Sequence, residues 1–240
     1  RTPLYNHLRR TPEVLVVGDA MAESGGGFIC GLGLTVAAWW KVSWPQDVVL
    51  RFHRTSQRLE SPDNMITIAH LELATLVLGL ATMTELLPDC TGRAVLALAD
   101  NTNTVSWARR AGAKDWRAAA LIRLTGTMEA RKRYSLATKH IEGVKNEEAD
   151  FISRHGEEEV AAYLADRPVP FLACMSSPPR IWSQVPTSSA YTQRVMATLL
   201  TTTSAPASGM PPTTPTTATG TSGGASATAV SYTHLRAHET

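Results

Sequence analysis

The sequence has few cysteines, and none of them has the spacing of a metal-binding or disulfide framework. Cys30, Cys90 and Cys174 are scattered along the chain and odd in number. This pattern excludes a disulfide-rich or zinc-finger domain and indicates a reducing, intracellular compartment, cytoplasmic or nuclear. The sequence also shows no signal peptide and no apolar run of membrane-spanning length, so we expect no membrane partner.

Over the whole chain, neither positive nor negative charge is in large excess. The 23 Lys and Arg residues nearly balance the 21 Asp and Glu residues, for a formal net charge of +2. Overall charge therefore does not select a partner. The excess is local, because nine basic residues lie from Trp107 to Lys139 and only Asp115 and Glu129 oppose them. This segment predicts either a phosphate-binding face or a solvated helix surface.

Charged residues are absent from 201–229, a stretch of mostly Thr, Ser, Ala, Pro and Gly. Such a composition cannot bury enough apolar surface to offset its ordering entropy, so we expect a disordered tail. The final residues, VSYTHLRAHET, resemble a translated sequencing-library transposase adapter, and we exclude them from fold reasoning as a scar. Composition thus divides the chain into an N-terminal flank, a globular domain, a linker with a short helix, the low-complexity tail and the scar: 1–12, 13–155, 156–200, 201–229 and 230–240.

Hydrophobic periodicity in the globular segment predicts a mixed α/β fold. Short apolar runs and alternating patterns indicate strands, whereas apolar residues at helical spacing before Pro88 indicate a long helix. The connection 45–65 contains one further candidate strand, Val48–Phe52. The expected order is three strands, a helix, a strand, two helices, a strand and a helix, over 14–19, 25–34, 35–44, 66–87, 94–99, 101–110, 114–132, 134–141 and 146–155.

Four carboxylates occupy positions that favour chemistry. Asp19 and Asp100 each end a buried strand, Glu72 lies one-third along the long helix, and Asp150 lies early in the last helix. If the two strands are neighbours, their acids meet at one edge of the sheet. Clustered carboxylates repel unless a cation lies between them, and hard oxygen ligands favour Mg²⁺. Each acid alone could equally be a helix cap, as Asp100 and Asn101 together illustrate, or a solvent-facing residue.

The short sequence motifs around these acids resemble those of the ribonuclease H family of retroelement reverse transcriptases, of the LTR or tyrosine-recombinase type. Asp19 lies in GDA before a glycine-rich strand, Glu72 in LELA, and Asp100 in ADNT. The stretch from His140 to Arg154 matches the family's strand–Gly–Asn–ADxxSR ending. The resemblance covers 13–155. It implies a ribonuclease H-like mixed five-stranded sheet flanked by helices.

The same resemblance implies a metal-dependent enzyme. Asp19, Glu72, Asp100 and Asp150 would be the ligands of two Mg²⁺ ions, with Mn²⁺ as an alternative. Asp19 would bridge both ions, Glu72 and Asp100 would hold one, and Asp150 the other. The reaction would cut the RNA strand of an RNA–DNA hybrid and leave a 3′-hydroxyl and a 5′-phosphate. The partners would be the hybrid and the polymerase domain of the same polyprotein. The residues expected to contact nucleic acid are Asn101, Thr102, Arg109, Arg110, Lys114 and Arg117.

The sequence departs from the bacterial-type pattern of the family in one respect. Those relatives carry a mobile histidine in the loop before the last acid, but the loop 142–145 has none. His140 is expected on the strand and His155 on the surface, so product release would rely on another group or be slower. The alternatives are an inactive nucleic-acid-binding domain, a DNA-cutting integrase or exonuclease on the same fold, and a structural polyprotein segment.

Overall fold

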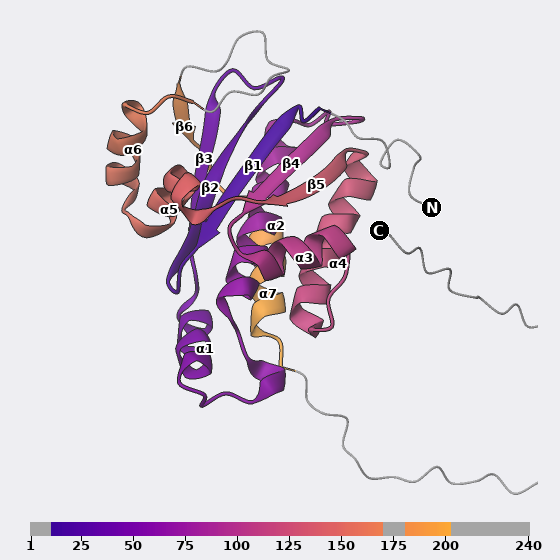
Figure 1. The fold of residues 1–240 in the computed structure, drawn as a ribbon, viewed down its shortest axis with the longest axis vertical. Helices are drawn as coiled ribbons and strands as arrows, with labels where there is room; N and C mark the ends of the chain where they lie inside the picture. Colours follow the sequence, from indigo (N-terminus) through magenta and orange to yellow (C-terminus); the bar gives the residue numbers. More distant parts are fainter. Residues whose placement is uncertain (1–10, 170–180, 203–240) are drawn as a thin grey trace, which may run out of the picture. The chain divides into compact units, whose positions relative to one another are not determined.

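The computed structural model describes residues 11–169 and 181–202. The predictions for the N-terminal flank, the low-complexity tail and the adapter-like end fall almost entirely outside these residues. Figure 1 shows a twisted sheet with helices on both faces. The elements run β1 Val14–Ala20, β2 Ser24–Gly31, β3 Ala37–Ser43, α1 Gln46–Ser56, η2 Pro62–Asn64, α2 Ile68–Leu86, β4 Ala94–Ala99, α3 Thr102–Arg110, α4 Trp116–Lys132, β5 Ser135–His140, η3 Gly143–Lys145, α5 Glu147–Arg154, α6 Glu157–Ala165, β6 Trp182–Gln184 and α7 Ser189–Leu200.

The sheet has the strand order β5-β4-β1-β2-β3-β6. Strands β1, β2 and β3 form an antiparallel meander, as the sequence predicts. Strand β4 then returns parallel to β1, and β5 runs parallel to β4. The mixed α/β class is therefore confirmed. The carboxyl ends of β1 and β4 lie side by side, which brings the acids at those ends to one edge.

Two apolar clusters cover the two faces of the sheet. Alternate residues of β1 point to opposite faces, so Val16 packs toward α2 and α4, whereas Val17 packs toward α5 and α6. Both faces are buried, which explains why the strands read as almost continuous apolar runs. Trp39, Trp40 and Trp44 are all at most 5% exposed and belong to the core.

The glycine-rich start of β2 lets helix α5 approach the sheet closely. A Cβ at Gly26 would lie 2.7 Å from Ile152 Cγ2 of α5 and 2.9 Å from the Trp40 carbonyl oxygen. Any larger side chain at this position would therefore push α5 away from the sheet. Gly26 therefore sets the distance between the sheet and the helix that carries Asp150.

Helix α2 runs through the core. The expectation of no membrane-length apolar run was wrong for this segment, because 62–86 has the length and hydropathy of a span. Its 18-residue window is 83% buried within the described structure. The helix is apolar all round because α4 and α7 cover the side that the sheet leaves open.

The connection 45–65 forms a helix, and the candidate strand at Val48–Phe52 was wrong. Helix α1 begins directly after its N-cap residue Pro45 and has Asp47 in its first turn, where a negative charge is favoured. The apolar residues of this short stretch fit a helical face as well as a strand. Periodicity alone could not separate the two structures.

Residues 156–200, which composition separates as a linker, add three described elements to the domain. Strand β6 pairs with β3 and makes the sheet six-stranded rather than five-stranded. Helix α6 packs over one face of the sheet, and α7 packs against α2 and α4 on the other (Figure 1). Val195 and Leu199 of α7 are fully buried.

Arg117 fastens the end of α7 to the body of the domain. Its guanidinium donates to the carbonyl oxygens of Asp63, Met65, Leu199 and Thr201 at 2.9–3.2 Å. Arg51 donates to the Leu199 and Leu200 carbonyls as well. The side chain of Arg117 is 0% exposed. The expectation that Arg117 contacts nucleic acid is therefore wrong, because its guanidinium is hydrogen-bonded to backbone carbonyl oxygens inside the protein.

Candidate metal centre

Three of the four predicted acids converge at the carboxyl ends of β1 and β4. Asp19 is the second-last residue of β1, and Asp100 follows β4 directly. Glu72 reaches both of them from α2. Carboxylate oxygens of these three residues all lie within 4.8 Å of one another. The convergence follows from the parallel pairing of β1 with β4, since Val17 pairs with Leu98 two residues before each acid.

Burial makes this cluster electrostatically costly. Asp19 is 3% exposed and Glu72 is 4% exposed. Burial, and then the negative charges of Asp19 and Asp100, raise the pKa of Glu72 to about 9. Burial likewise raises the pKa of Asp19 to about 6, with added repulsion from Asp100 and Asp150, although a hydrogen bond from Ser153 opposes the rise. The carboxyl of Glu72 thus resists ionisation at neutral pH, whereas that of Asp19 resists it only in mildly acidic solution.

A divalent cation fits the donor set of this cluster. Glu72 Oε1 accepts a long hydrogen bond, 3.4 Å, from the Ala20 backbone N–H. Glu72 Oε2 is buried and has no hydrogen-bond partner among the described residues. A buried polar atom without a partner is rare, and here it lies in a group of three carboxylates that a single ion can reach. Such all-oxygen sets favour Mg²⁺ or Mn²⁺ over softer-ligand metals.

Asp150 lies outside the group of three. It occupies the first turn of α5, its side chain is 44% exposed, and its Oδ1 accepts a hydrogen bond of 2.6 Å from Arg154 Nε. Its charge still raises the pKa of Asp19, so the two carboxylates are electrostatic neighbours. The structure therefore brings together Asp19, Glu72 and Asp100, and leaves Asp150 at the border in an ion pair.

Ser153 connects α5 to the metal centre, and the sequence motif gave it no role. Its hydroxyl donates to Asp19 Oδ2 at 2.6 Å, and its side chain is fully buried. Ser153 lies three residues after Asp150, so both face the same side of the helix. That spacing is the signal in the sequence from which the contact could have been inferred.

Lys41 and Ser24 hold the end of the same helix. The Lys41 ammonium donates to the carbonyls of Ile152, Ser153 and His155 at 2.7–2.8 Å. Ser24 donates a short hydrogen bond of 2.5 Å to the Ser153 carbonyl. A cation at a helix C-terminus satisfies carbonyls that have no partner within the helix. These contacts fix α5, and with it Asp150, against β2 and β3.

The chain is similar in structure to an RNase H domain. That domain is the N-terminal RNase H domain of a Mycobacterium tuberculosis protein, solved as a fusion protein with maltose binding protein. The identity is 12% and the TM-score 0.40, and the match covers 64% of this chain and 99% of that chain. No family model and no curated protein matches the chain.

The residues expected to contact nucleic acid occupy different environments. Asn101 caps α3, because its Oδ1 accepts the backbone N–H groups of Asn103 and Thr104 at 3.0 and 3.2 Å. Thr102, Arg109 and Arg110 are exposed on α3, and Lys114 is exposed in the turn after it. Four of the six thus lie at the surface, Asn101 is partly occupied in capping, and Arg117 is buried.

His140 ends β5, as expected, but it lies nearer the acids than its place in the sequence indicates. Strand pairing puts His140 opposite Ala99, directly before Asp100. Its Nε2 lies 2.9 Å from the Asp100 carbonyl oxygen. Because a carbonyl only accepts, this nitrogen carries the proton and donates. An exposed imidazole therefore borders the carboxylate cluster.

Proposed function

We propose that this protein is a ribonuclease H that hydrolyses the RNA strand of RNA–DNA hybrids with bound divalent cations. The observation that carries the proposal is the convergence of Asp19, Glu72 and Asp100 within 4.8 Å. These are three of the four acids that the family resemblance selects, and they come from β1, α2 and the end of β4. Hydrolysis would break the bond between phosphorus and the 3′-oxygen, leaving a 3′-hydroxyl and a 5′-phosphate.

The residues of the chain have distinct tasks in this proposal. A bound divalent cation would supply an activated water and stabilise the leaving oxygen. Asp19, Glu72 and Asp100 would hold it, and Asp150 would contribute from α5 once released from Arg154. Ser153 orients Asp19 by occupying one of its two oxygens. The burial of Glu72 limits the access of bulk water to that carboxylate.

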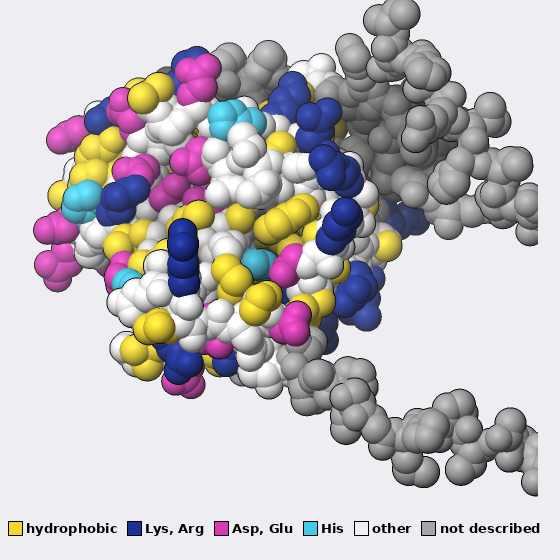
Figure 2. Space-filling model, turned by 60° about the horizontal axis from the view of Figure 1, so that its bottom comes forward, with side chains coloured by type: hydrophobic (Ala, Val, Ile, Leu, Met, Phe, Trp, Pro, Cys, Tyr) yellow, Lys and Arg dark blue, Asp and Glu magenta, His cyan; other side chains and the backbone are white. Residues whose placement is uncertain are grey.

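The surface charge agrees with a nucleic-acid substrate. Figure 2 shows Lys and Arg side chains following one another along one side of the view, whereas acidic side chains gather mainly on the other. Such a row suits the phosphates of a duplex. We further infer that the domain acts in the cytoplasm or nucleus. It would belong to the same polyprotein as a reverse transcriptase polymerase of the LTR or tyrosine-recombinase type. The sequence resemblance supports this context.

The test is hybrid cleavage by the wild type and an Asp100→Asn variant. A labelled RNA–DNA hybrid is incubated with each protein and Mg²⁺, and binding is followed separately by fluorescence anisotropy in EDTA. Asp100→Asn should lose nearly all cutting and keep binding, because only a ligand oxygen is replaced. Asp166→Asn, an exposed residue at the end of α6, is the matched control and should cut normally.

The outcomes separate the alternatives. Cutting that is unchanged in Asp100→Asn refutes the assignment of the centre. Binding without cutting by the wild type, in either Mg²⁺ or Mn²⁺, identifies an inactive nucleic-acid-binding domain. Preferential cutting of duplex DNA or single strands, run in parallel, identifies an integrase-like or exonuclease activity instead.

A further inference from the structure

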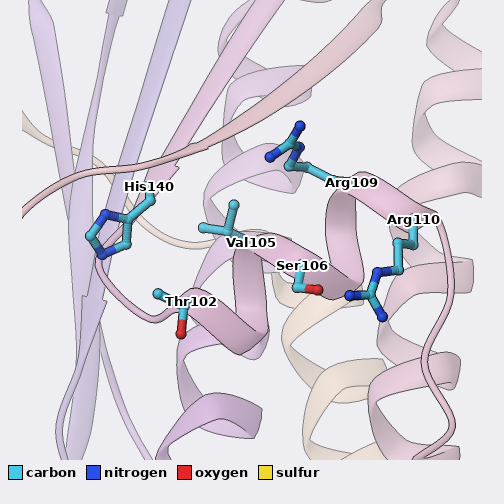
Figure 3. Close-up of a pocket in the computed structure, with 6 residues that line it drawn as sticks. All are labelled: Thr102, Val105, Ser106, Arg109, Arg110 and His140. Carbon is cyan, nitrogen blue, oxygen red and sulfur yellow. The ribbon is translucent and has the colours of Figure 1, made fainter. Parts of the chain in front are cut away.

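A pocket lies beside the carboxylate cluster, between α3 and the end of β5. Its volume is about 470 Å³, within the range of sites that hold small ligands or parts of larger ones. Figure 3 shows its side chains, with His140 and Thr102 near one end and Arg109 and Arg110 near the other. We call it the α3–β5 pocket and define it by its lining residues, Thr102, Val105, Ser106, Arg109, Arg110 and His140.

The composition of the α3–β5 pocket suits an anion. None of its six lining residues is acidic, and two are exposed arginines in the last turn of α3. Within 11–169 and 181–202, neither guanidinium makes an ion pair or a side-chain hydrogen bond. Their charges are thus balanced only by the helix C-terminus, and their donors are available to phosphate oxygens.

His140 joins the pocket to the metal centre. It lines the pocket and at the same time donates to the Asp100 carbonyl at 2.9 Å. Thr102 follows Asp100 by two residues and opens α3. A strand whose phosphate lies at the carboxylates would therefore pass directly into this pocket.

The length of α3 sets how far along the strand the pocket reaches. Thr102 and Arg109 are seven residues apart, which corresponds to about 10 Å at ~1.5 Å per residue. One strand of a duplex advances ~3.4 Å per nucleotide along the axis, so for a strand that follows α3 the arginines lie about three nucleotide steps beyond Thr102. Thr102 and Ser106 offer hydroxyls between those two points, where sugars of the strand would lie.

We propose that the α3–β5 pocket holds the sugar–phosphate backbone of the cleaved strand, on one side of the cleaved bond and within about three nucleotides of it. Arg109 and Arg110 bind a phosphate there, and the hydroxyls of Thr102 and Ser106 face the intervening sugars. This inference rests on the proposed function, because it assumes that the strand enters the carboxylate cluster.

The test combines a protein variant with neutral phosphates in the substrate. The cleaved strand carries four ribonucleotides flanked by DNA, which confines the cut. A single uncharged methylphosphonate is then placed at each flanking position in turn, and on the opposite strand as a comparison. Binding is measured in EDTA by anisotropy at several salt concentrations, for wild type, Arg109→Ala/Arg110→Ala and Arg123→Ala. Arg123 is an exposed arginine of α4 outside the α3–β5 pocket.

The expected result is specific to one position. The double variant should bind the unmodified hybrid about tenfold more weakly at ~0.1 M salt, with a salt slope lower by about one per lost phosphate contact. One methylphosphonate in the cleaved strand should weaken wild-type binding and should have no further effect in the double variant. Arg123→Ala should retain the wild-type response at that position.

Two failures are distinguishable. If the wild type neither binds nor cuts the hybrid, the proposed function itself fails. If the wild type cuts the hybrid but the double variant keeps the wild-type salt slope and methylphosphonate profile, the function stands and the pocket proposal is overturned. A uniform loss at every position, or a response confined to the opposite strand, overturns it equally.

Discussion

Replacing Glu72 by Gln should make the metal-free protein more stable and the metal-dependent activity disappear. Glu72 is buried, and the pKa of its carboxyl is raised from 4.5 to about 9. Between these two pH values the folded protein binds more protons than the unfolded chain, so stability falls as pH rises. The glutamine side chain has nearly the same shape and no charge to titrate.

The size of the effect follows from the pKa difference. Each pH unit between the two pKa values changes the free energy of unfolding by about 1.4 kcal/mol. From pH 4.5 to pH 7 the wild type therefore loses roughly 3 kcal/mol of stability, which the Glu72→Gln variant does not lose. For a domain of this size, 1 kcal/mol changes Tm by about 2–4 °C. In EDTA, the Tm of the variant minus the Tm of the wild type should therefore be about 6–12 °C larger at pH 7 than near pH 4.5.

The assay is thermal unfolding by circular dichroism from pH 4.5 to pH 8.5, in EDTA and again in Mg²⁺. Mg²⁺ should stabilise the wild type more at high pH than at low pH, because the cation binds the ionised carboxylates, and should stabilise Glu72→Gln little. Glu85→Gln, at an exposed position of the same helix, is the matched control and should follow the wild type. A Tm difference between Glu72→Gln and the wild type that is the same at every pH would refute the reasoning.

Two further predictions concern residues outside the carboxylate group. Ser153→Ala removes the 2.6 Å hydrogen bond to Asp19 and should weaken divalent-cation binding about 10- to 100-fold, measured by Mn²⁺ titration; an unchanged titration would exclude a positioning role. Arg117→Met leaves four carbonyl oxygens without their buried donor and should cost about 3–5 kcal/mol in urea unfolding, with hybrid affinity of the folded protein unchanged. Stability within about 1 kcal/mol of the wild type would contradict the structural role of Arg117.

The sequence predicted the order of the strands and α-helices from β1 to α5, with α1 missing, and the edge of the sheet at which the acids meet. Buried strands read as apolar runs that end in an acid, and α2 reads as a long apolar helix before Pro88. Both signals are local, since a few neighbouring residues define them. The connection 45–65 was misassigned because its apolar residues are too few to separate the helical period from the strand period.

The fate of individual charged residues could not be read from local pattern. Arg117 belongs to a basic segment that predicts a phosphate-binding face, yet its partners are carbonyls as far away as Thr201. Asp150 and Ser153 occupy the same motif, but only Ser153 contacts Asp19, since Asp150 is paired with Arg154. These outcomes depend on which elements pack together over long sequence separations.

By itself, the sequence determined the α/β class, the order of the strands and α-helices from β1 to α5 except for α1, and which carboxylates are candidates for a metal centre, because periodicity and strand-end acids are local properties. Only the tertiary structure decided that three of those carboxylates share one ion-sized space, that residues 182–200 complete the sheet and core, and that Arg117 is buried. Those features arise from burial and hydrogen bonding between segments that are distant in sequence. The free energy of each such side chain depends on its partners in the fold, and the residues next to it in the sequence do not specify those partners.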